Sequence, residues 1–166
     1  KVLEVTLRTP VALDAIRAMS EVDGAIVGAG TVTNERELGD AIAAGSKFIV
    51  SPGLTEPLGQ AAIRERIPFL PGIANAGDIM RGLDLGLTHF KFFPAMAAGG
   101  LPALKALAAP FGQCRFCPTG GISLANAPSY LSLPNTVCGA VRLRLGVLRH
   151  LGGPVRSRQK ILCLSV

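Results

Sequence analysis

The chain has 166 residues, of which 49% are hydrophobic, so its length and composition suit one globular domain with a sizeable core. The sequence contains neither an uninterrupted apolar run of about 18 residues nor a signal-peptide pattern, which argues against a membrane protein and favours a cytoplasmic one. The net charge of +6 does not indicate a nucleic-acid partner. Six of the seventeen basic residues follow Cys138, whereas all eleven acidic residues lie at or before Asp84. The part of the chain up to Cys138, the body of the protein, is therefore neutral.

Short apolar runs alternate with amphipathic stretches along the chain. The predicted strands are Val2–Thr6, Ala25–Ala29, Phe48–Ser51, Pro68–Leu70, His89–Phe92 and Cys114–Pro118. The predicted helices are Val11–Met19, Glu35–Ala44, Pro57–Arg64, Asp78–Leu83 and Leu101–Ala108. Asn34 and Thr55 stand where helix starts are expected. Gly24, Gly45 and Gly86 follow helices, where a left-handed residue often ends the last turn.

This alternation predicts parallel βαβ units. A doubly wound sheet would also fit, but polar and Gly/Pro-rich corners follow nearly every strand, and a barrel collects such corners on the face that carries its active site. We therefore predict an α/β fold, a (β/α)8 TIM barrel. Six clear units and a seventh near Thr136–Cys138 fall short of eight, so we expect an incomplete barrel whose first βα unit is missing and whose last unit is altered.

The first strand alternates apolar and polar residues. Glu4, Thr6 and Arg8 share one face, which we predict to point into the barrel, while the apolar face packs on helices. Charges in a barrel interior are costly unless they are paired or used. The alternative is an exposed edge strand with a solvated polar face.

Lys91 is flanked by aromatic residues, in the order Phe90-Lys91-Phe92-Phe93. Apolar surroundings disfavour the ammonium form and lower the pKa of a lysine, which makes its amine a nucleophile suited to a carbonyl carbon. The alternative is a snorkelling lysine whose amine reaches solvent.

Thr119-Gly120-Gly121 follows a predicted strand and precedes a helix expected near Ala125, an arrangement typical of phosphate sites, although Gly-Gly pairs also form plain turns. Cys114 and Cys117 have CxxC spacing, but they lie on opposite faces of a strand. We interpret them as reduced thiols rather than as metal ligands.

Six segments together resemble the 2-keto-3-deoxy-6-phosphogluconate (KDPG)/4-hydroxy-2-oxoglutarate (KHG) aldolase family. They are LEVTLRT at Leu3–Thr9, GAGTV at Gly28–Val32, SPGLTEP at Ser51–Pro57, FLPG at Phe69–Gly72, FKFFPA at Phe90–Ala95 and FCPTGGIS at Phe116–Ser123. They occur in the family's order and spacing as far as about Cys138. FKFFPA and FCPTGGIS together are highly specific.

The resemblance implies a class I aldolase that needs no metal and no cofactor. Lys91 matches the family's Schiff-base lysine, and Glu4 matches its general acid/base, which works through a water. The positions that match substrate-binding residues are Arg8 and Thr31 for the keto-acid carboxylate, Pro52, Phe93 and Thr119 for the pocket, and Gly120 and Gly121 for phosphate. The family usually forms homotrimers.

The expected reaction is cleavage of KDPG to pyruvate and glyceraldehyde 3-phosphate, with 4-hydroxy-2-oxoglutarate, cleaved to pyruvate and glyoxylate, as a second substrate. The alternatives are an aldolase for the galactonate epimer and a catalytically inactive, truncated remnant. After Cys138 the resemblance stops, since the Gly-Gly-Ser-Trp segment of the family is absent. We therefore divide the chain into a barrel domain, residues 1–138, and a divergent basic tail, residues 139–166.

Overall fold

Parallel strands and helices alternate in the computed structural model, which describes residues 2–142 and 161–165. The strands are β1 (Val2–Thr6), β2 (Ile26–Gly30), β3 (Ile49–Val50), β4 (Phe69–Leu70), β5 (Gly72–Ile73), β6 (His89–Phe92), β7 (Arg115–Pro118), β8 (Cys138–Arg142) and β9 (Ile161–Ser165). The helices are α1 (Ala12–Ser20), α2 (Glu35–Ala43), α3 (Glu56–Arg64), α4 (Ala76–Asp84), α5 (Gly100–Ala108) and α6 (Ala127–Leu131).

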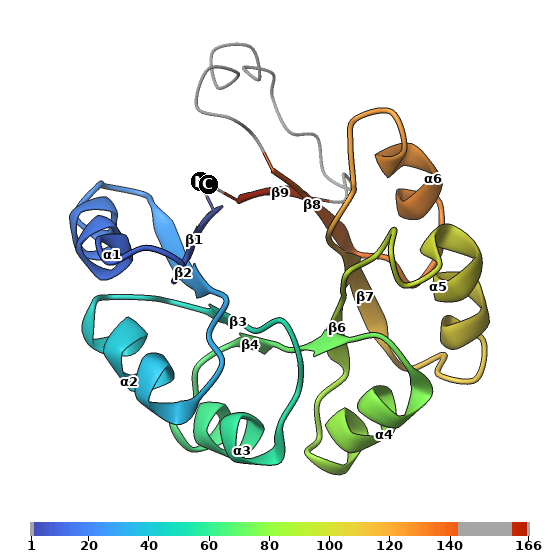
Figure 1. Cartoon of the computed structure of the whole chain (residues 1–166), viewed down its shortest axis with the longest axis horizontal. Helices are drawn as coiled ribbons and strands as arrows, with labels where there is room; N and C mark the ends of the chain where they lie inside the picture. The colour runs from blue at the N-terminus through green and yellow to red at the C-terminus, as the bar shows by residue number, and fades with distance from the viewer. Residues whose placement is uncertain (1, 143–160, 166) are drawn as a thin grey trace.

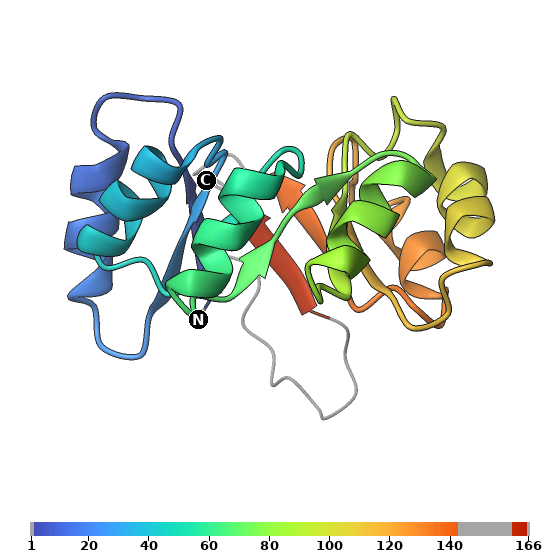
Figure 2. The same cartoon turned by 90° about the horizontal axis from the view of Figure 1, so that it is seen from below.

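The strands form a ring with the helices on its outside (Figure 1), and they run side by side between the helices in the side view (Figure 2). One sheet has the order β4-β3-β2-β1-β9-β8 and the other β5-β6-β7, with every pairing parallel. Pro71 alone separates β4 from β5, and a bridge from Phe116 to Thr136 connects β7 to the segment before β8. The predicted α/β barrel architecture is confirmed.

Two strands lie in the part of the chain that we assigned to the tail. The barrel domain was expected to end at Cys138, but β8 continues from there to Arg142. β9 pairs with β8 on one side and with β1 on the other. The rest of the tail, residues 143–160 and 166, lies outside the described residues.

The core consists of aliphatic and aromatic side chains between the strands and the helices. Val27 and Ile49 pack with Leu38 of α2 in one cluster. Phe90 and Phe116 pack in a second cluster, with their ring centroids 6.4 Å apart. Because successive strand residues point to opposite faces, the buried phenylalanines of β6 turn Lys91 toward the barrel interior.

Helix starts follow the polar residues that precede them. The Asn34 side chain accepts a hydrogen bond from the Glu37 backbone N–H at 2.9 Å, and the Glu37 carboxylate accepts one from the Thr33 N–H. The start of α3 was also predicted, but the Thr55 side chain makes no capping hydrogen bond. Asn75 caps α4, which begins at Ala76, before the predicted start at Asp78.

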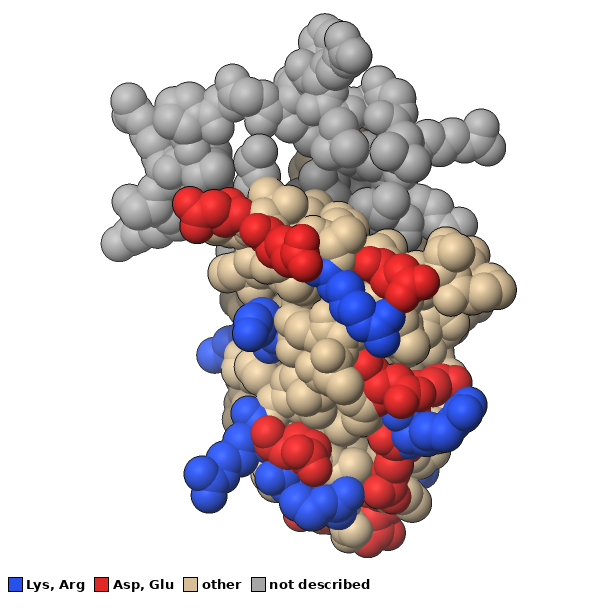
Figure 3. Space-filling view, turned by 90° about the vertical axis from the view of Figure 1, so that its left-hand side faces the viewer, with Lys and Arg blue, Asp and Glu red and all other residues tan. Residues whose placement is uncertain are grey.

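The outer surface carries charges of both signs. Acidic and basic side chains are interspersed over the face where α1 and α2 lie (Figure 3). Arg64 of α3 pairs with Glu35 of α2 at 3.1 Å, for example. This mixture agrees with a neutral barrel body. No helix in the described ranges is long and apolar enough to span a membrane.

Two helical glycines should respond oppositely to alanine substitution. Gly39 in α2 is exposed, and an added Cβ meets nothing within 4 Å, so Gly39→Ala should raise the free energy of unfolding by about 0.5–1 kcal/mol. Gly82 in α4 is buried, and its Cβ would lie 2.3 Å from Cε1 of the buried Phe90, so Gly82→Ala should lower it by about 1–3 kcal/mol. Urea denaturation of both variants measures the difference, and shifts of the same sign would contradict this packing.

Candidate active site

The predicted site residues surround one cavity of about 500 Å³. Its lining residues are Glu4, Thr6, Arg8, Thr31, Pro52, Lys91, Phe93, Thr119, Gly120, Gly121 and Ile122. All nine residues that the sequence singled out are among them. Most lie at or just after the carboxyl ends of strands, which is the end of a barrel where active sites are found. Thr6 and Ile122 were not among the expected site residues.

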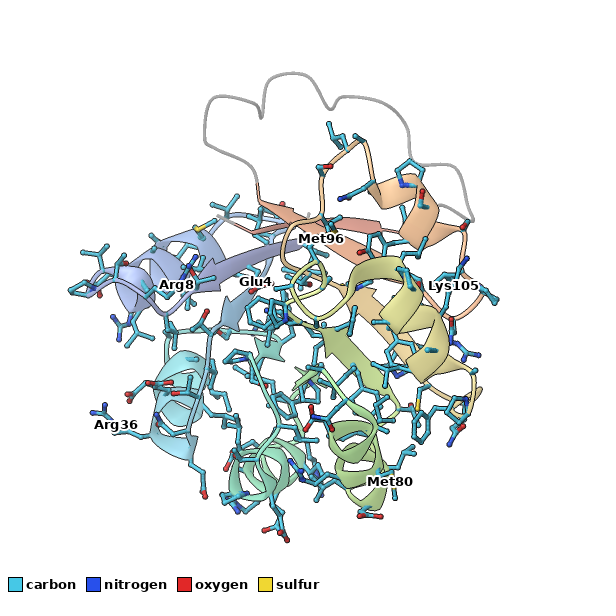
Figure 4. The ribbon with its side chains drawn as sticks, turned by 45° about the vertical axis from the view of Figure 1, so that its right-hand side comes forward. Glu4, Arg8, Arg36, Met80, Met96 and Lys105 are labelled. Atoms are coloured by element: carbon cyan, nitrogen blue, oxygen red, sulfur yellow. The ribbon has the colours of Figure 1, made fainter. Side chains whose placement is uncertain are left out.

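The polar face of β1 runs from the interior of the barrel to its mouth. Glu4 is only 8% exposed, Thr6 is half-buried and Arg8 is exposed. Figure 4 shows Glu4 inside the ring and Arg8 farther along the chain, whereas Arg36 and Met80 point outward. Glu4 and Thr6 line the cavity, so the predicted inward face is confirmed. β1 has a hydrogen-bonded neighbour on each side, so the edge-strand alternative is wrong.

Lys91 is buried, with 6% of its surface exposed, and its Nζ atom lies 4.7 Å from the centroid of the Phe93 ring. The snorkelling alternative is therefore wrong. Burial lowers the pKa of Lys91, because desolvation penalises the ammonium form, and the Glu4 carboxylate acts in the opposite direction. The lysine thus has the environment of a nucleophilic amine.

Burial shifts the pKa of Glu4 in the opposite direction from that of Lys91, and both shifts favour the uncharged form. Desolvation raises the pKa of Glu4, and the positive charges of Lys91 and Arg8 oppose that rise. The neighbouring cations favour the ionised carboxylate, but burial is the larger effect. The pair therefore combines an amine that gives up its proton more readily than an exposed lysine with a carboxyl group that holds its proton more readily than an exposed glutamate.

Gly30 allows Glu4 to lie against β2. A Cβ atom at Gly30 would lie 2.0 Å from the Glu4 Oε1 atom, so a larger residue would displace the carboxylate. The next residue, Thr31, has a left-handed φ of 61° and lines the cavity beyond the strand.

The loop after β7 is held against the loop after β6. Gly120 and Gly121 have φ values of 95° and 81°, which favour glycine. The carbonyl groups of Thr119 and Gly120 accept hydrogen bonds from the backbone N–H groups of Ala95 and Met96, at 2.8 and 3.1 Å. α6 begins at Ala127, later than expected, and none of its residues lines the cavity.

The two cysteines of the CxxC segment occupy different surroundings. Cys114 and Cys117 are buried free thiols, and Cys117 lies beside Lys91 in the register of β6 and β7. Burial raises the pKa of the Cys114 thiol. Within residues 2–142 and 161–165, no group of three or more histidine, cysteine, aspartate or glutamate side chains could hold a metal ion.

Comparison with known proteins gives consistent matches. The family model described as KDPG and KHG aldolase matches residues 1–144. The KHG/KDPG aldolase of Escherichia coli K12 is 58% identical over 139 residues, which cover 83% of this chain and 65% of that protein. This chain therefore spans just under two thirds of that relative.

Two solved structures have the same fold. The structure of the 2-keto-3-deoxy-6-phosphogluconate aldolase of Zymomonas mobilis ZM4 with 3-phosphoglycerate has a TM-score of 0.82 and 60% identity, covering 83% of this chain and 66% of that one. The structure of the KDPG aldolase of Legionella pneumophila, with pyruvate captured as a covalent carbinolamine intermediate, has a TM-score of 0.80 and 49% identity, covering 83% and 68% of the two chains.

Proposed function

The chain belongs to the KDPG and KHG aldolase family, and from that premise we propose that it is a class I aldolase that cleaves KDPG to pyruvate and glyceraldehyde 3-phosphate. One observation carries the proposal: Lys91 is buried in a cavity that it shares with Glu4 and Arg8. The cavity volume, about 500 Å³, lies within the range of small-molecule sites, roughly 300–1,000 Å³. The names of the relatives favour this substrate over its galactonate epimer.

In the proposed mechanism, the neutral amine of Lys91 attacks the C2 ketone of the substrate. The carbinolamine loses water to give an iminium ion, which accepts the electron pair of the C3–C4 bond. Glu4 removes the proton of the C4 hydroxyl, directly or through a water, and glyceraldehyde 3-phosphate leaves. The remaining enamine is protonated at C3 and hydrolysed, which releases pyruvate and restores the amine.

The other lining residues have proposed binding roles. Arg8 and Thr31 bind the keto-acid carboxylate at the mouth of the cavity, where the guanidinium is exposed. Pro52, Phe93 and Thr119 form the wall, and Gly120 and Gly121 hold the phosphate group with their backbone. Because 4-hydroxy-2-oxoglutarate contains the same keto-acid end, we propose it as a second substrate, cleaved to pyruvate and glyoxylate.

Reductive trapping with pyruvate tests the proposed function. In the presence of pyruvate and borohydride, the chain should gain one irreversible adduct, and peptide mass spectrometry should locate it on Lys91. The same preparation should release pyruvate from KDPG in a coupled assay. Cooperative melting without adduct or product would support the alternative of an inactive remnant and would contradict the proposal.

We also propose an oligomeric assembly, a cellular location and a domain division for this chain. We propose a homotrimer, which the family resemblance supports, and the exposed apolar residues Val11, Val22 and Ile26 supply surface for contacts between copies. The free thiols of Cys114 and Cys117 support a reducing, cytoplasmic environment. We propose a divergent basic tail within residues 139–166, and the end of the family match at residue 144 supports a loss of resemblance in this part of the chain.

A further inference from the structure

Thr6 lines the cavity between two residues of the proposed mechanism. It lies on the same face of β1 as Glu4, at the end of the strand and two residues before Arg8, and it is half-buried. In the register of the sheet it faces Gly30, which fixes its backbone beside β2. Thr6 has no role in substrate binding or proton transfer in the proposed mechanism.

Thr6 holds Arg8 through two hydrogen bonds. The Arg8 Nε–H donates to the Thr6 hydroxyl oxygen at 3.2 Å, and the Arg8 backbone N–H donates to the Thr6 carbonyl at 2.8 Å. In the part of the chain that the structure describes, the guanidinium has no other hydrogen bond and no ion pair. An exposed arginine samples many rotamers. Because the guanidinium is planar, the hydrogen bond of Nε to Thr6 restricts the directions in which the two Nη groups point.

From this geometry we infer that Thr6 is a positioning residue, which fixes Arg8 so that its terminal Nη groups face the carboxylate of the keto acid. The inference rests on the proposed function. With Nε bonded to Thr6, the two Nη groups remain as donors, and a planar carboxylate can accept from both of them. Thr6 then acts through Arg8 and does not touch the reacting atoms.

The test is Thr6→Val, which keeps the shape and strand preference of threonine but removes the hydroxyl. The pyruvate concentration for half-maximal borohydride labelling of Lys91 should rise about five- to tenfold, the size of the effect of losing one ordinary intramolecular hydrogen bond. Thr6→Ser should restore the wild-type value. Thr55→Val is the matched control, because Thr55 does not line the cavity and its side chain makes no capping hydrogen bond.

A second carbonyl compound separates positioning from general damage. Acetaldehyde has no carboxylate, so its labelling of Lys91 should be unchanged in Thr6→Val. If the variant weakens labelling by acetaldehyde and pyruvate equally, the change has displaced Lys91 and the inference is overturned. It is also overturned if pyruvate labelling is unaffected, or if Thr6→Ser does not restore it.

Hydrogen exchange at Arg8 tests the positioning without aldolase chemistry. The Arg8 Nε–H, followed by NMR, should exchange slowly in the wild-type and Thr6→Ser chains and at least about fivefold faster in Thr6→Val. Equal exchange rates in wild type and Thr6→Val overturn the inference. If the wild-type chain captures no pyruvate but the exchange rates differ as expected, the proposed function fails while the contact from Thr6 to Arg8 stands.

Discussion

Replacing Lys91 by methionine should abolish the pyruvate adduct and reduce kcat/KM for KDPG cleavage by roughly four orders of magnitude or more. Methionine keeps an unbranched chain in the space beside Phe93, so the cavity stays filled while the nucleophile is removed. Among the residues that the structure describes, no other lysine lines the cavity, so none of the described lysines offers a second amine for the iminium. The loss is measured by the coupled pyruvate assay and by intact mass after borohydride treatment.

Lys105→Met provides the matched control for this experiment. Lys105 is exposed on α5 and does not line the cavity, so its replacement should leave the adduct and the cleavage rate unchanged. Far-UV circular dichroism and thermal melting should show that both variants are folded. Cleavage by the folded Lys91→Met variant at even a tenth of the wild-type rate would contradict the assignment of the nucleophile.

Replacing Glu4 by glutamine should lower the cleavage rate by about 10²- to 10⁴-fold and leave the capture of pyruvate in place. The carboxylate is the proposed base for the C4 hydroxyl, and an amide cannot accept that proton. The negative charge of Glu4 opposes the lowering of the pKa of Lys91. Its removal therefore favours the neutral amine, and the first step of the reaction survives.

The pH profile distinguishes this role from a loss of structure. The base must be ionised, so wild-type kcat/KM should rise with pH through the pKa of Glu4. Because burial raises that pKa, the rise should occur above the value of about 4.3 for an exposed glutamate, and it should be absent in Glu4→Gln. Glu65→Gln removes an exposed carboxylate and should preserve the profile. An unchanged acid limb in Glu4→Gln would exclude Glu4 as the titrating group.

The sequence predicted the parts of the site that depend on local periodicity. Alternation from Leu3 to Arg8 predicted that Glu4 and Arg8 share the inward face, although β1 itself ends at Thr6, and the phenylalanines around Lys91 indicated its burial. Both patterns follow from the two-residue period of a strand, which needs no knowledge of neighbouring strands. The six family segments then brought the loop residues Thr31, Pro52 and Thr119 into one predicted site, and the structure places all three at the cavity.

Features that depend on pairing between distant segments could not be predicted in this way. The contact of Gly30 with Glu4 requires the register of β1 and β2, and the bond from Arg8 to Thr6 requires a particular arginine conformation. β5 was missed because it begins at Gly72, directly after Pro71, in a Gly/Pro-rich segment that indicates the corner after β4. β9 was missed because its apolar run Ile161–Ser165 stands outside the strand–helix repeat, and its partners come from both ends of the chain.

The close approach of Glu4 to Gly30 restricts how this barrel can diversify. The carboxyl group of Glu4, the proposed base, occupies the volume that a methyl group at residue 30 would need. The Glu4 side chain of β1 can therefore extend this far only because β2 has a glycine at that position. Rim residues such as the half-buried Pro52 can be varied to accept other aldehydes without entering that volume. A directed-evolution library for new acceptors therefore belongs at the rim, and codon 30 should be kept invariant.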